Sequence, residues 1–256
     1  NFIALIFGLL VPITFITLRD FFSDTIRSKS DLLNSTNIPI LGLIGHSDNA
    51  TSLVVSNASK SIIAESFRAL RTNIQYLAAD KEKKIITVTS SIGGEGKPFT
   101  TMNLAAIIAL SGHKTILIGG DLRKPKLHED FKVDTSKGLS SYLINKSELA
   151  EVIEKTEIDS LDVIASGPTP PNPAELLDSK KMKDLIMELN KTYDYVIIDT
   201  PPIGLVTDGV ILMQHADVNL YIVRHNYSKK SALNVINNLY HQKQVENVHI
   251  IINDFK

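Results

Sequence analysis

The chain contains no cysteine and almost no net charge. Without cysteine, a disulfide framework, a cysteine-ligated metal centre and a thiol nucleophile are all excluded. Lys and Arg together number 27 and Asp and Glu 28, for a formal net charge of −1. Because neither sign builds a field that would steer a polyanion, we expect no nucleic-acid partner. The 256 residues, 43% of them hydrophobic, suffice for the core of one large or two small domains.

Charged side chains are missing from the first segment, FIALIFGLLVPITFITL at residues 2–18. At about 1.5 Å per residue this segment would span about 25 Å as a helix, slightly short of a complete bilayer crossing. Because residue 1 is Asn, we interpret 1–18 as the C-terminal part of a transmembrane helix of a longer protein. A buried soluble helix is the alternative.

The residues that follow this apolar segment indicate its orientation. Arg19, Arg27 and Lys29 place the next residues in the cytoplasm by the positive-inside tendency. Residues 19–57 are rich in Ser, Asn, Asp and Thr and are typical of a linker. An apolar stretch at 38–44 within it is a candidate docking strand. We therefore expect a cytoplasmic linker over 19–57.

From residue 58 onward, strand-like and helix-like segments alternate. An amphipathic helix is predicted over 59–79, where apolar residues recur at helical spacing. Apolar, β-branched runs that indicate buried strands follow at 85–89, 115–119, 161–165, 195–199, 219–224 and 248–253. Helices are predicted between them at about 99–111, 173–190, 205–215 and 229–243. Residues 58–256 are thus expected to form a doubly wound, mostly parallel α/β sheet of the P-loop NTPase type, with its ligand at the carboxyl ends of the strands.

A glycine-rich segment, SSIGGEGKPFT at 90–100, joins the first of these strands to its helix. The glycines let backbone N–H groups turn inward, the helix offers its positive end, and Lys97 can reach the outer phosphates of a nucleotide. A plain structural turn is the alternative. The residues predicted to contact the nucleotide are Gly93, Gly94, Glu95, Gly96, Lys97, Phe99 and Thr100.

One position of this loop departs from the usual pattern. A P-loop normally carries Ser or Thr after the lysine as a magnesium ligand, and here Pro98 has neither a hydroxyl nor an N–H group. Proline is acceptable in the first turn of a helix, so the fold should survive. Thr100 and Thr101 follow two and three positions later, and we expect neither hydroxyl to reach the same place.

Two aspartates follow predicted strands. Asp199 ends YVIID, where a P-loop protein carries its metal-associated aspartate, and Asp121 follows the second strand within GGDLRKP. Both are candidates for the ligand edge of the sheet. The alternatives are a helix-capping or turn role for Asp199 and a surface turn for Asp121.

Together these motifs resemble those of the bacterial tyrosine kinases, whose cytoplasmic domain follows the second transmembrane helix of a polysaccharide co-polymerase. The resemblance rests on ESFRALRTNIQY at 65–76, GGEGK at 93–97, DLRKP at 121–125, GLSSYL at 138–143, PPNPAELL at 170–177 and VIIDTPPIG at 196–204. The related partition and septum-site ATPases carry a lysine just before the paired glycines, where this chain has Ile92. That difference favours the kinases.

The resemblance implies a protein-tyrosine autokinase that binds ATP and Mg²⁺ and regulates the chain length and export of capsular or exopolysaccharide. It implies Lys97, Asp121 and Asp199 as catalytic residues, with Asp121 and Asp199 also at the metal. The E-x-x-R-x-x-R pattern of Glu65, Arg68 and Arg71 matches the oligomerisation motif of a ring. On a helix these three residues share one face. A solvated charged stripe is the alternative.

The resemblance also implies partners and a location. The expected partners are a tyrosine-rich C-terminal tail of the same or a neighbouring subunit, the polysaccharide polymerase and export machinery, and a tyrosine phosphatase. The expected location is the cytoplasmic side of the bacterial inner membrane, with residues 1–18 in the bilayer.

Two further departures leave the function open at this point. The first aspartate of the family's second loop motif is replaced by Gly119, and the seven tyrosines are scattered and form no cluster. Loss of a catalytic or metal-associated group, such as the carboxylate missing at Gly119, commonly weakens transition-state stabilisation by several kcal/mol. The alternatives to a kinase are therefore a catalytically weakened nucleotide-binding scaffold and a membrane-tethered partition-type ATPase.

Overall fold

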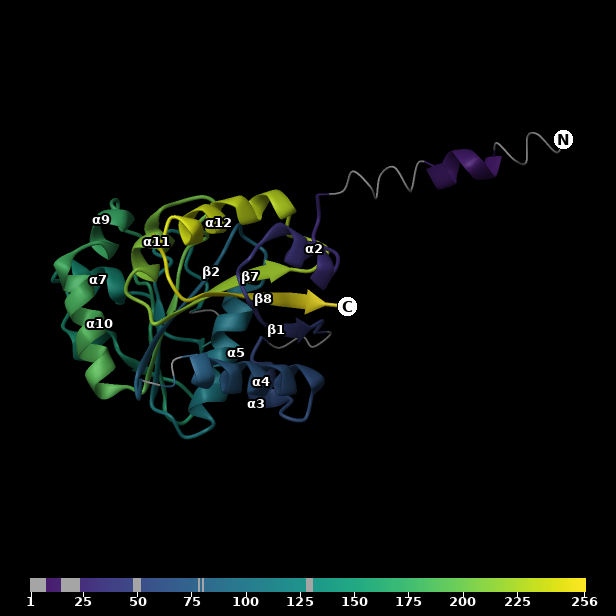
Figure 1. Ribbon diagram of the computed structural model, residues 1–256. Helices are drawn as coiled ribbons and strands as arrows, with labels where there is room; N and C mark the ends of the chain where they lie inside the picture. Colours follow the sequence, from purple (N-terminus) through teal and green to yellow (C-terminus); the bar gives the residue numbers. More distant parts are fainter. Residues whose placement is uncertain (1–7, 15–23, 48–51, 78, 80, 128–130) are drawn as a thin grey trace.

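The computed structural model describes residues 8–14, 24–47, 52–77, 79, 81–127 and 131–256 (Figure 1). Its centre is an eight-stranded sheet with the order β1-β8-β7-β2-β6-β3-β5-β4. The strands are β1 (Ile40–Gly45), β2 (Lys84–Ser90), β3 (Thr115–Gly119), β4 (Glu154–Lys155), β5 (Leu161–Ile164), β6 (Tyr195–Asp199), β7 (Val218–Arg224) and β8 (Val248–Phe255). All neighbouring strands are parallel except β4 and β5. The predicted doubly wound, mostly parallel sheet is confirmed.

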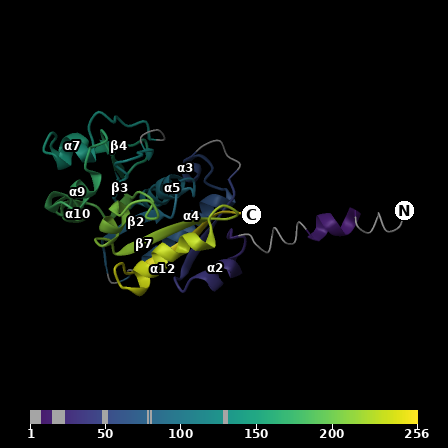
Figure 2. The same ribbon diagram turned by 90° about the horizontal axis from the view of Figure 1, so that it is seen from above.

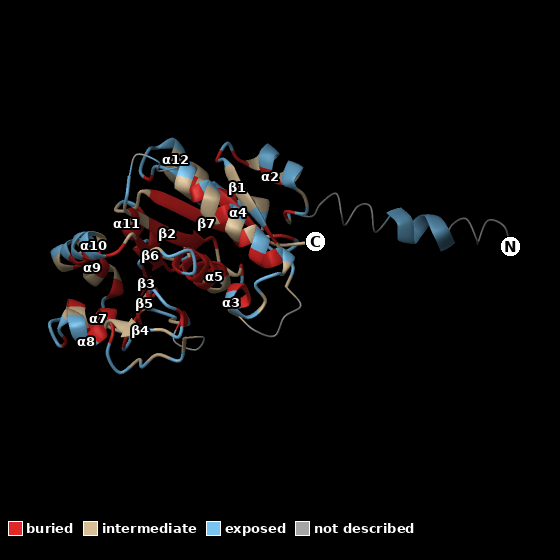
Figure 3. Ribbon diagram, turned by 90° about the horizontal axis from the view of Figure 1, so that it is seen from below, coloured by how far each residue is buried: buried red, intermediate tan, exposed pale blue. Residues whose placement is uncertain are grey.

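Helices cover both faces of the sheet, which gives three layers (Figure 2). One face carries α3 (Val54–Asn57), α4 (Ile62–Leu77) and α5 (Lys97–Ala109). The other face carries α2 (Lys29–Ser35), α7 (Leu139–Leu143), α9 (Pro173–Leu177), α10 (Lys180–Thr192), α11 (Asp208–Met213) and α12 (Leu233–His241). The short helices α8 (Leu149–Val152) and η1 (Lys230–Ala232) lie in connections. Because both faces are covered, the central strands are buried and apolar on both sides, as the sequence indicated (Figure 3).

Helix α5 follows the glycine-rich loop and lies in the interior. Almost all of its residues are buried, including Lys97, since β2 and β6 lie on one side and α4 on the other. Phe99 at its start meets Phe67 of α4 edge to face, with ring centroids 6.0 Å apart. A helix that is apolar all round is the type expected in such a position. The helix begins at Lys97, two residues before its predicted start.

The predicted helix over 173–190 is divided into α9 and α10. Ser179 interrupts it, because its side chain accepts a hydrogen bond from the backbone of Met182 and caps the second helix. The apolar stretch at 38–44 does dock as a strand: β1 pairs in parallel with β8 at one edge of the sheet. The sheet therefore includes residues that precede position 58.

The uncharged first segment lies largely outside the described residues. Residues 8–14 are helical and exposed. Within the described ranges, no helix combines the length and the apolar character that a membrane crossing needs.

Candidate active site

The glycine-rich loop lies at the carboxyl end of β2, in the middle of the sheet, and borders a cavity of about 540 Å³. The loop forms one wall with Gly93, Gly94 and Lys97. Asp199 at the end of β6 and Asp121 just after β3 line the same cavity. The topology thus brings together the three predicted catalytic side chains, which are far apart in sequence, at the edge where ligands bind in such sheets.

The loop needs glycine at two positions. Gly94 and Gly96 have φ angles of +87° and +85°, in the left-handed region that other residues rarely adopt. Glu95 lies between them with its carboxylate buried, and Oε2 accepts hydrogen bonds from the N–H groups of Ser91 at 2.7 Å and Ile92 at 3.0 Å. The Glu95 carboxylate therefore braces the base of the loop, and only the backbone of this residue is left to meet a phosphate.

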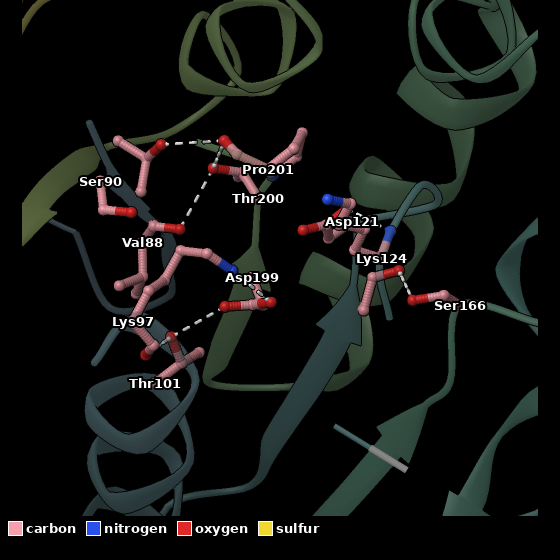
Figure 4. A network of polar contacts seen from close by, with 12 residues as sticks. Val88, Ser90, Lys97, Thr101, Asp121, Lys124, Ser166, Asp199, Thr200 and Pro201 are labelled. Atoms are coloured by element: carbon pink, nitrogen blue, oxygen red, sulfur yellow. Dashed lines mark hydrogen bonds and ion pairs between the residues drawn. The ribbon is translucent and has the colours of Figure 1, made fainter. Parts of the chain in front are cut away.

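Lys97 and Asp199 form a buried ion pair beneath the loop (Figure 4). The distance from Nζ to Oδ2 is 2.7 Å, and the two side chains are only 7% and 4% exposed. Burial raises the pKa of Asp199 above that of an ordinary aspartate, and the Lys97 ammonium opposes this shift. Removing either partner would leave an uncompensated charge in the interior, so the pair is strongly coupled.

Thr101 provides a hydroxyl next to Asp199. Its Oγ1 lies 3.1 Å from Oδ1 of Asp199 and 2.8 Å from the carbonyl oxygen of Lys97 (Figure 4). Positions 98 and 101 are three residues apart and so share one face of the helix, which brings this hydroxyl to Asp199. Thr101 is not among the residues that line the cavity, and the expectation that neither following threonine takes the place of the hydroxyl missing at position 98 stays a prediction. Thr100, in contrast, buries its hydroxyl with no partner among the described residues.

Asp121 is oriented by the turn that follows β3. Its Oδ1 accepts hydrogen bonds from the backbone N–H groups of Arg123 at 3.2 Å and Lys124 at 3.0 Å. Burial is the main cause of the raised pKa of Asp199, and the negative charge of Asp121 acts in the same direction. Arg123 also lines the cavity, and its guanidinium binds both oxygens of the buried Asp208, at 2.7 and 3.1 Å.

Gly119, which replaces the other acidic position of this motif, is closely packed. The Ser166 hydroxyl donates a hydrogen bond to its carbonyl oxygen at 2.8 Å. A Cβ atom at this position would lie 2.6 Å from Ser166 Oγ and 3.0 Å from the Ser166 backbone nitrogen. The missing carboxylate therefore goes together with close packing of the segment after β5 against the glycine.

The donors at the cavity fit magnesium in the form that nucleotide sites use. Mg²⁺ in such sites is held by one or two carboxylates together with substrate phosphate oxygens and water. Asp121 and Asp199 provide two carboxylates at the cavity, and Pro98 provides no hydroxyl. No group of three or more potential His, Asp or Glu ligands occurs in the parts of the chain that are described. A bound nucleotide would have to provide much of the coordination.

The predicted oligomerisation residues lie on α4, away from the cavity. Arg68 donates to Glu65 Oε1 at 2.5 Å and to the carbonyl oxygen of Ser59 at 2.7 Å, so these two charges pair within the chain. Arg71 differs, because its Nε is buried and has no partner among the described residues. On the same helix, Ile62 and Tyr76 are 83% and 77% exposed.

Three side chains that sequence reasoning missed contact the glycine-rich loop. Arg224 at the end of β7, Tyr227 in the next turn and Asn253 on β8 each donate a hydrogen bond to the loop backbone. None belongs to a recognisable motif, and only the sheet order places β7 and β8 beside the loop.

A glycine loop between a strand and a buried helix, with its lysine opposite a strand-end aspartate, defines a P-loop nucleotide-binding protein. Residues 83–254 match the family described as "AAA domain". The chain is 42% identical over 178 residues to the tyrosine-protein kinase YwqD of Bacillus subtilis, which covers 70% of this chain and 75% of the relative.

Two further proteins extend the similarity. The tyrosine-protein kinase ptk of Acinetobacter johnsonii is 34% identical over 252 residues, which cover 93% of this chain but 34% of that protein. The kinase domain of the Escherichia coli tyrosine kinase ETK superposes with a TM-score of 0.83 at 31% identity, covering 89% of this chain and 94% of that domain. The chain belongs to the family of bacterial tyrosine-protein kinases.

Proposed function

We propose that this chain is an ATP-dependent protein-tyrosine kinase that regulates the chain length and export of capsular or exopolysaccharide. The observation that carries the proposal is the convergence of Lys97, Asp121 and Asp199 on one cavity beneath a glycine-rich loop. Membership of the tyrosine-kinase family supports the choice of tyrosine as acceptor.

The loop and its helix bind the phosphates of ATP. Inward-facing N–H groups and the positive end of α5 attract the phosphate oxygens. The Lys97 ammonium lies next to the loop and offsets the charge that develops on the transferred group. Asp121 and Asp199 would hold Mg²⁺, which supplies further neutralisation of that charge.

The reaction is an in-line transfer. The tyrosine oxygen attacks the γ-phosphorus, the bond from this phosphorus to the β–γ bridging oxygen breaks, and ADP leaves. We assign the phenolic proton to Asp121, whose Oδ1 is occupied by two backbone N–H groups while the carboxylate lines the cavity.

The wider setting is proposed on the same basis. The chain spans about a third of the Acinetobacter kinase. We infer assembly into a ring through the α4 helix, an acceptor tail rich in tyrosine, removal of the phosphate by a tyrosine phosphatase, and contact with the polysaccharide polymerase. Residues 1–18 would attach the domain to the cytoplasmic side of the inner membrane.

The test is phosphotyrosine formation by the full chain with Mg-ATP and a tyrosine-rich acceptor peptide, detected by mass spectrometry. We expect transfer by the native sequence and loss of at least about 100-fold in Lys97→Met, because the ammonium stabilises the transition state. If phosphotyrosine appears only after Pro98→Thr, the kinase proposal is wrong and the native chain is a nucleotide-binding scaffold. If the native chain hydrolyses ATP efficiently without forming phosphotyrosine, the proposal is also wrong and the chain is an ATPase.

A further inference from the structure

The carbonyl oxygens of three successive residues in the glycine-rich loop are bound by side chains from the neighbouring part of the sheet. The hydrogen bonds run from Tyr227 Oη to Gly93 O, from Arg224 Nη1 to Gly94 O and from Asn253 Nδ2 to Glu95 O, each 3.0 Å long. We call Arg224, Tyr227 and Asn253 the carbonyl clamp. The three donors come from the end of β7, the turn after it and β8.

The clamp fixes the direction of the N–H groups as well. In a trans peptide the carbonyl oxygen and the next N–H group point to opposite sides of the chain. The bonds to the clamp therefore turn the N–H groups of Gly94, Glu95 and Gly96 away from β7 and β8. Within the described part of the chain, no protein acceptor binds the N–H groups of Gly94 and Gly96. These are the groups that a phosphate would meet.

The clamp residues are themselves held in place. Asn253 is only 6% exposed, and its Nδ2 lies 1.9 Å from where a Cβ on Gly96 would be, so the close approach requires a glycine there. The Arg224 guanidinium also pairs with Asp254 at 2.9 Å and lies over the Tyr227 ring, 5.2 Å from its centroid. Arg224 and Tyr227 are thus oriented by contacts that do not involve the loop, and Asn253 is held by its burial on β8.

We propose that Arg224, Tyr227 and Asn253 are positioning residues that arrange the phosphate-binding N–H groups before ATP arrives. The proposal rests on the proposed function, since it concerns the same phosphate site. Its physical reason is preorganisation: a loop already fixed in its binding geometry loses less conformational freedom when the ligand binds. Tyr227 lines the cavity as well, so recognition of the nucleotide base by its hydroxyl is the competing role.

The test compares ATP with inorganic tripolyphosphate, which has the phosphates but no base, by calorimetry on the full chain. Tyr227→Phe removes only the hydroxyl. We expect it to weaken both ligands by the same factor, about three- to tenfold, as for one hydrogen bond. Arg224→Lys, which keeps a positive charge near Asp254, should act in the same direction. Tyr240→Phe on α12 is the matched control and should leave both affinities unchanged.

Three results would count against the clamp. Unchanged tripolyphosphate affinity in both clamp variants would overturn it. Weaker ATP binding with unchanged tripolyphosphate binding would assign Tyr227 to the base instead. A native chain that binds neither ligand would refute the nucleotide site itself, and with it the clamp. Thermal unfolding measured in parallel shows whether a variant acts through the stability of the fold, because a purely structural role would lower the midpoint without a matched change in both affinities.

Discussion

Pro98 and Thr101 together show how this site keeps a hydroxyl next to its buried aspartate. The residue after the lysine cannot provide one, but Thr101 lies one turn along the helix and reaches Asp199 at 3.1 Å. The hydrogen bond from Thr101 lowers the pKa of Asp199 and so opposes part of the effect of burial. This hydroxyl orients the carboxylate, and it does not recreate the missing ligand, because it also contacts the Lys97 carbonyl.

We expect Thr101→Val to destabilise the protein and to raise the pKa of Asp199 further. The cost should be about 1–2 kcal/mol in the free energy of unfolding, since a buried carboxylate loses a donor. Urea denaturation measures the cost, and the acid limb of the pH–rate profile should move to higher pH. Thr100→Val is the matched control, because that hydroxyl is buried without a partner among the described residues. Equal losses in the two variants would contradict this account.

The sequence position of Gly119 suggests only the loss of an acidic residue, whereas in the structure this glycine is needed for close packing against Ser166. The strand end lies against Ser166, so an aspartate restored at position 119 would have to displace that residue. Overpacking of this kind typically costs about 1–3 kcal/mol. The glycine is therefore part of the local packing. A variant that restores aspartate at position 119 would change the stability of the fold as well as catalysis, so its activity alone would not measure the catalytic effect.

At the scale of elements, residues 25–31, which precede the first strand of the sheet, are attached to the turn after β7. Thr25 bridges to Lys229, the Ile26 N–H group binds the carbonyl oxygen of Ser228 at 2.9 Å, and Lys230 pairs with Asp31 at 2.6 Å. Ser28 caps α2 by accepting a hydrogen bond from the Asp31 backbone at 3.1 Å. Asp31 thus links the N-terminal cap of α2 to Lys230 of η1.

The hydrogen bond from Lys230 lowers the pKa of Asp31 from 3.8 to about 2. The carboxylate form is favoured in the folded protein, so its contribution is complete above the unfolded value and is lost as the pH falls through the folded value. For Asp31→Asn we expect a loss of about 1 kcal/mol at neutral pH, small because the pair is partly exposed. The difference from the native chain should shrink between about pH 4 and pH 2.

Urea denaturation of both chains across this range measures the effect. Asp184→Asn, on the exposed side of α10, is the control for a general change of charge. A difference that stays constant down to pH 2 would mean that the Asp31 carboxylate does not stabilise the segment through this pair.

At the scale of the whole molecule, we infer that α4 is the surface that a neighbouring subunit contacts in the proposed ring. Its buried side packs on the sheet through Phe67, Leu70 and Ile74, while Ile62 and Tyr76 remain exposed. The Glu65–Arg68 pair lies at the surface of the same helix. Exposed apolar side chains next to charges are the composition expected of an interface with a polar rim.

We expect the double substitution of Glu65 and Arg68 by Ala to reduce self-assembly by at least about tenfold in association constant, as for the loss of interface hot spots. Analytical ultracentrifugation of the full chain measures this. The unfolding free energy of the monomer should change by less than about 1 kcal/mol, because an exposed pair contributes little to it. Glu188→Ala on α10 is the control. Assembly at native strength in the double variant would exclude this helix as the interface.

Much of the fold was predictable because its signals are local. The strands at 115–119 and 195–199 have the predicted bounds, since apolar, β-branched runs between turns specify buried strands. The predicted helix over 173–190 failed at Ser179, where a side-chain cap starts a new helix within a continuous pattern. The apolar stretch at 38–44 predicted a docking strand, but its partner β8 and the place of α2 could not be predicted, because they depend on residues at the other end of the chain.

The sequence by itself determined the glycine loop, Lys97 and the strand-end aspartates, because their order of strand, turn and helix is a local property of the chain. Only the tertiary structure decided what surrounds them. The sheet order places β7 and β8 where Arg224, Tyr227 and Asn253 bind the loop carbonyls, and the helix turn brings Thr101 to Asp199. Hydrogen bonds between residues distant in sequence depend on packing, which no single segment encodes.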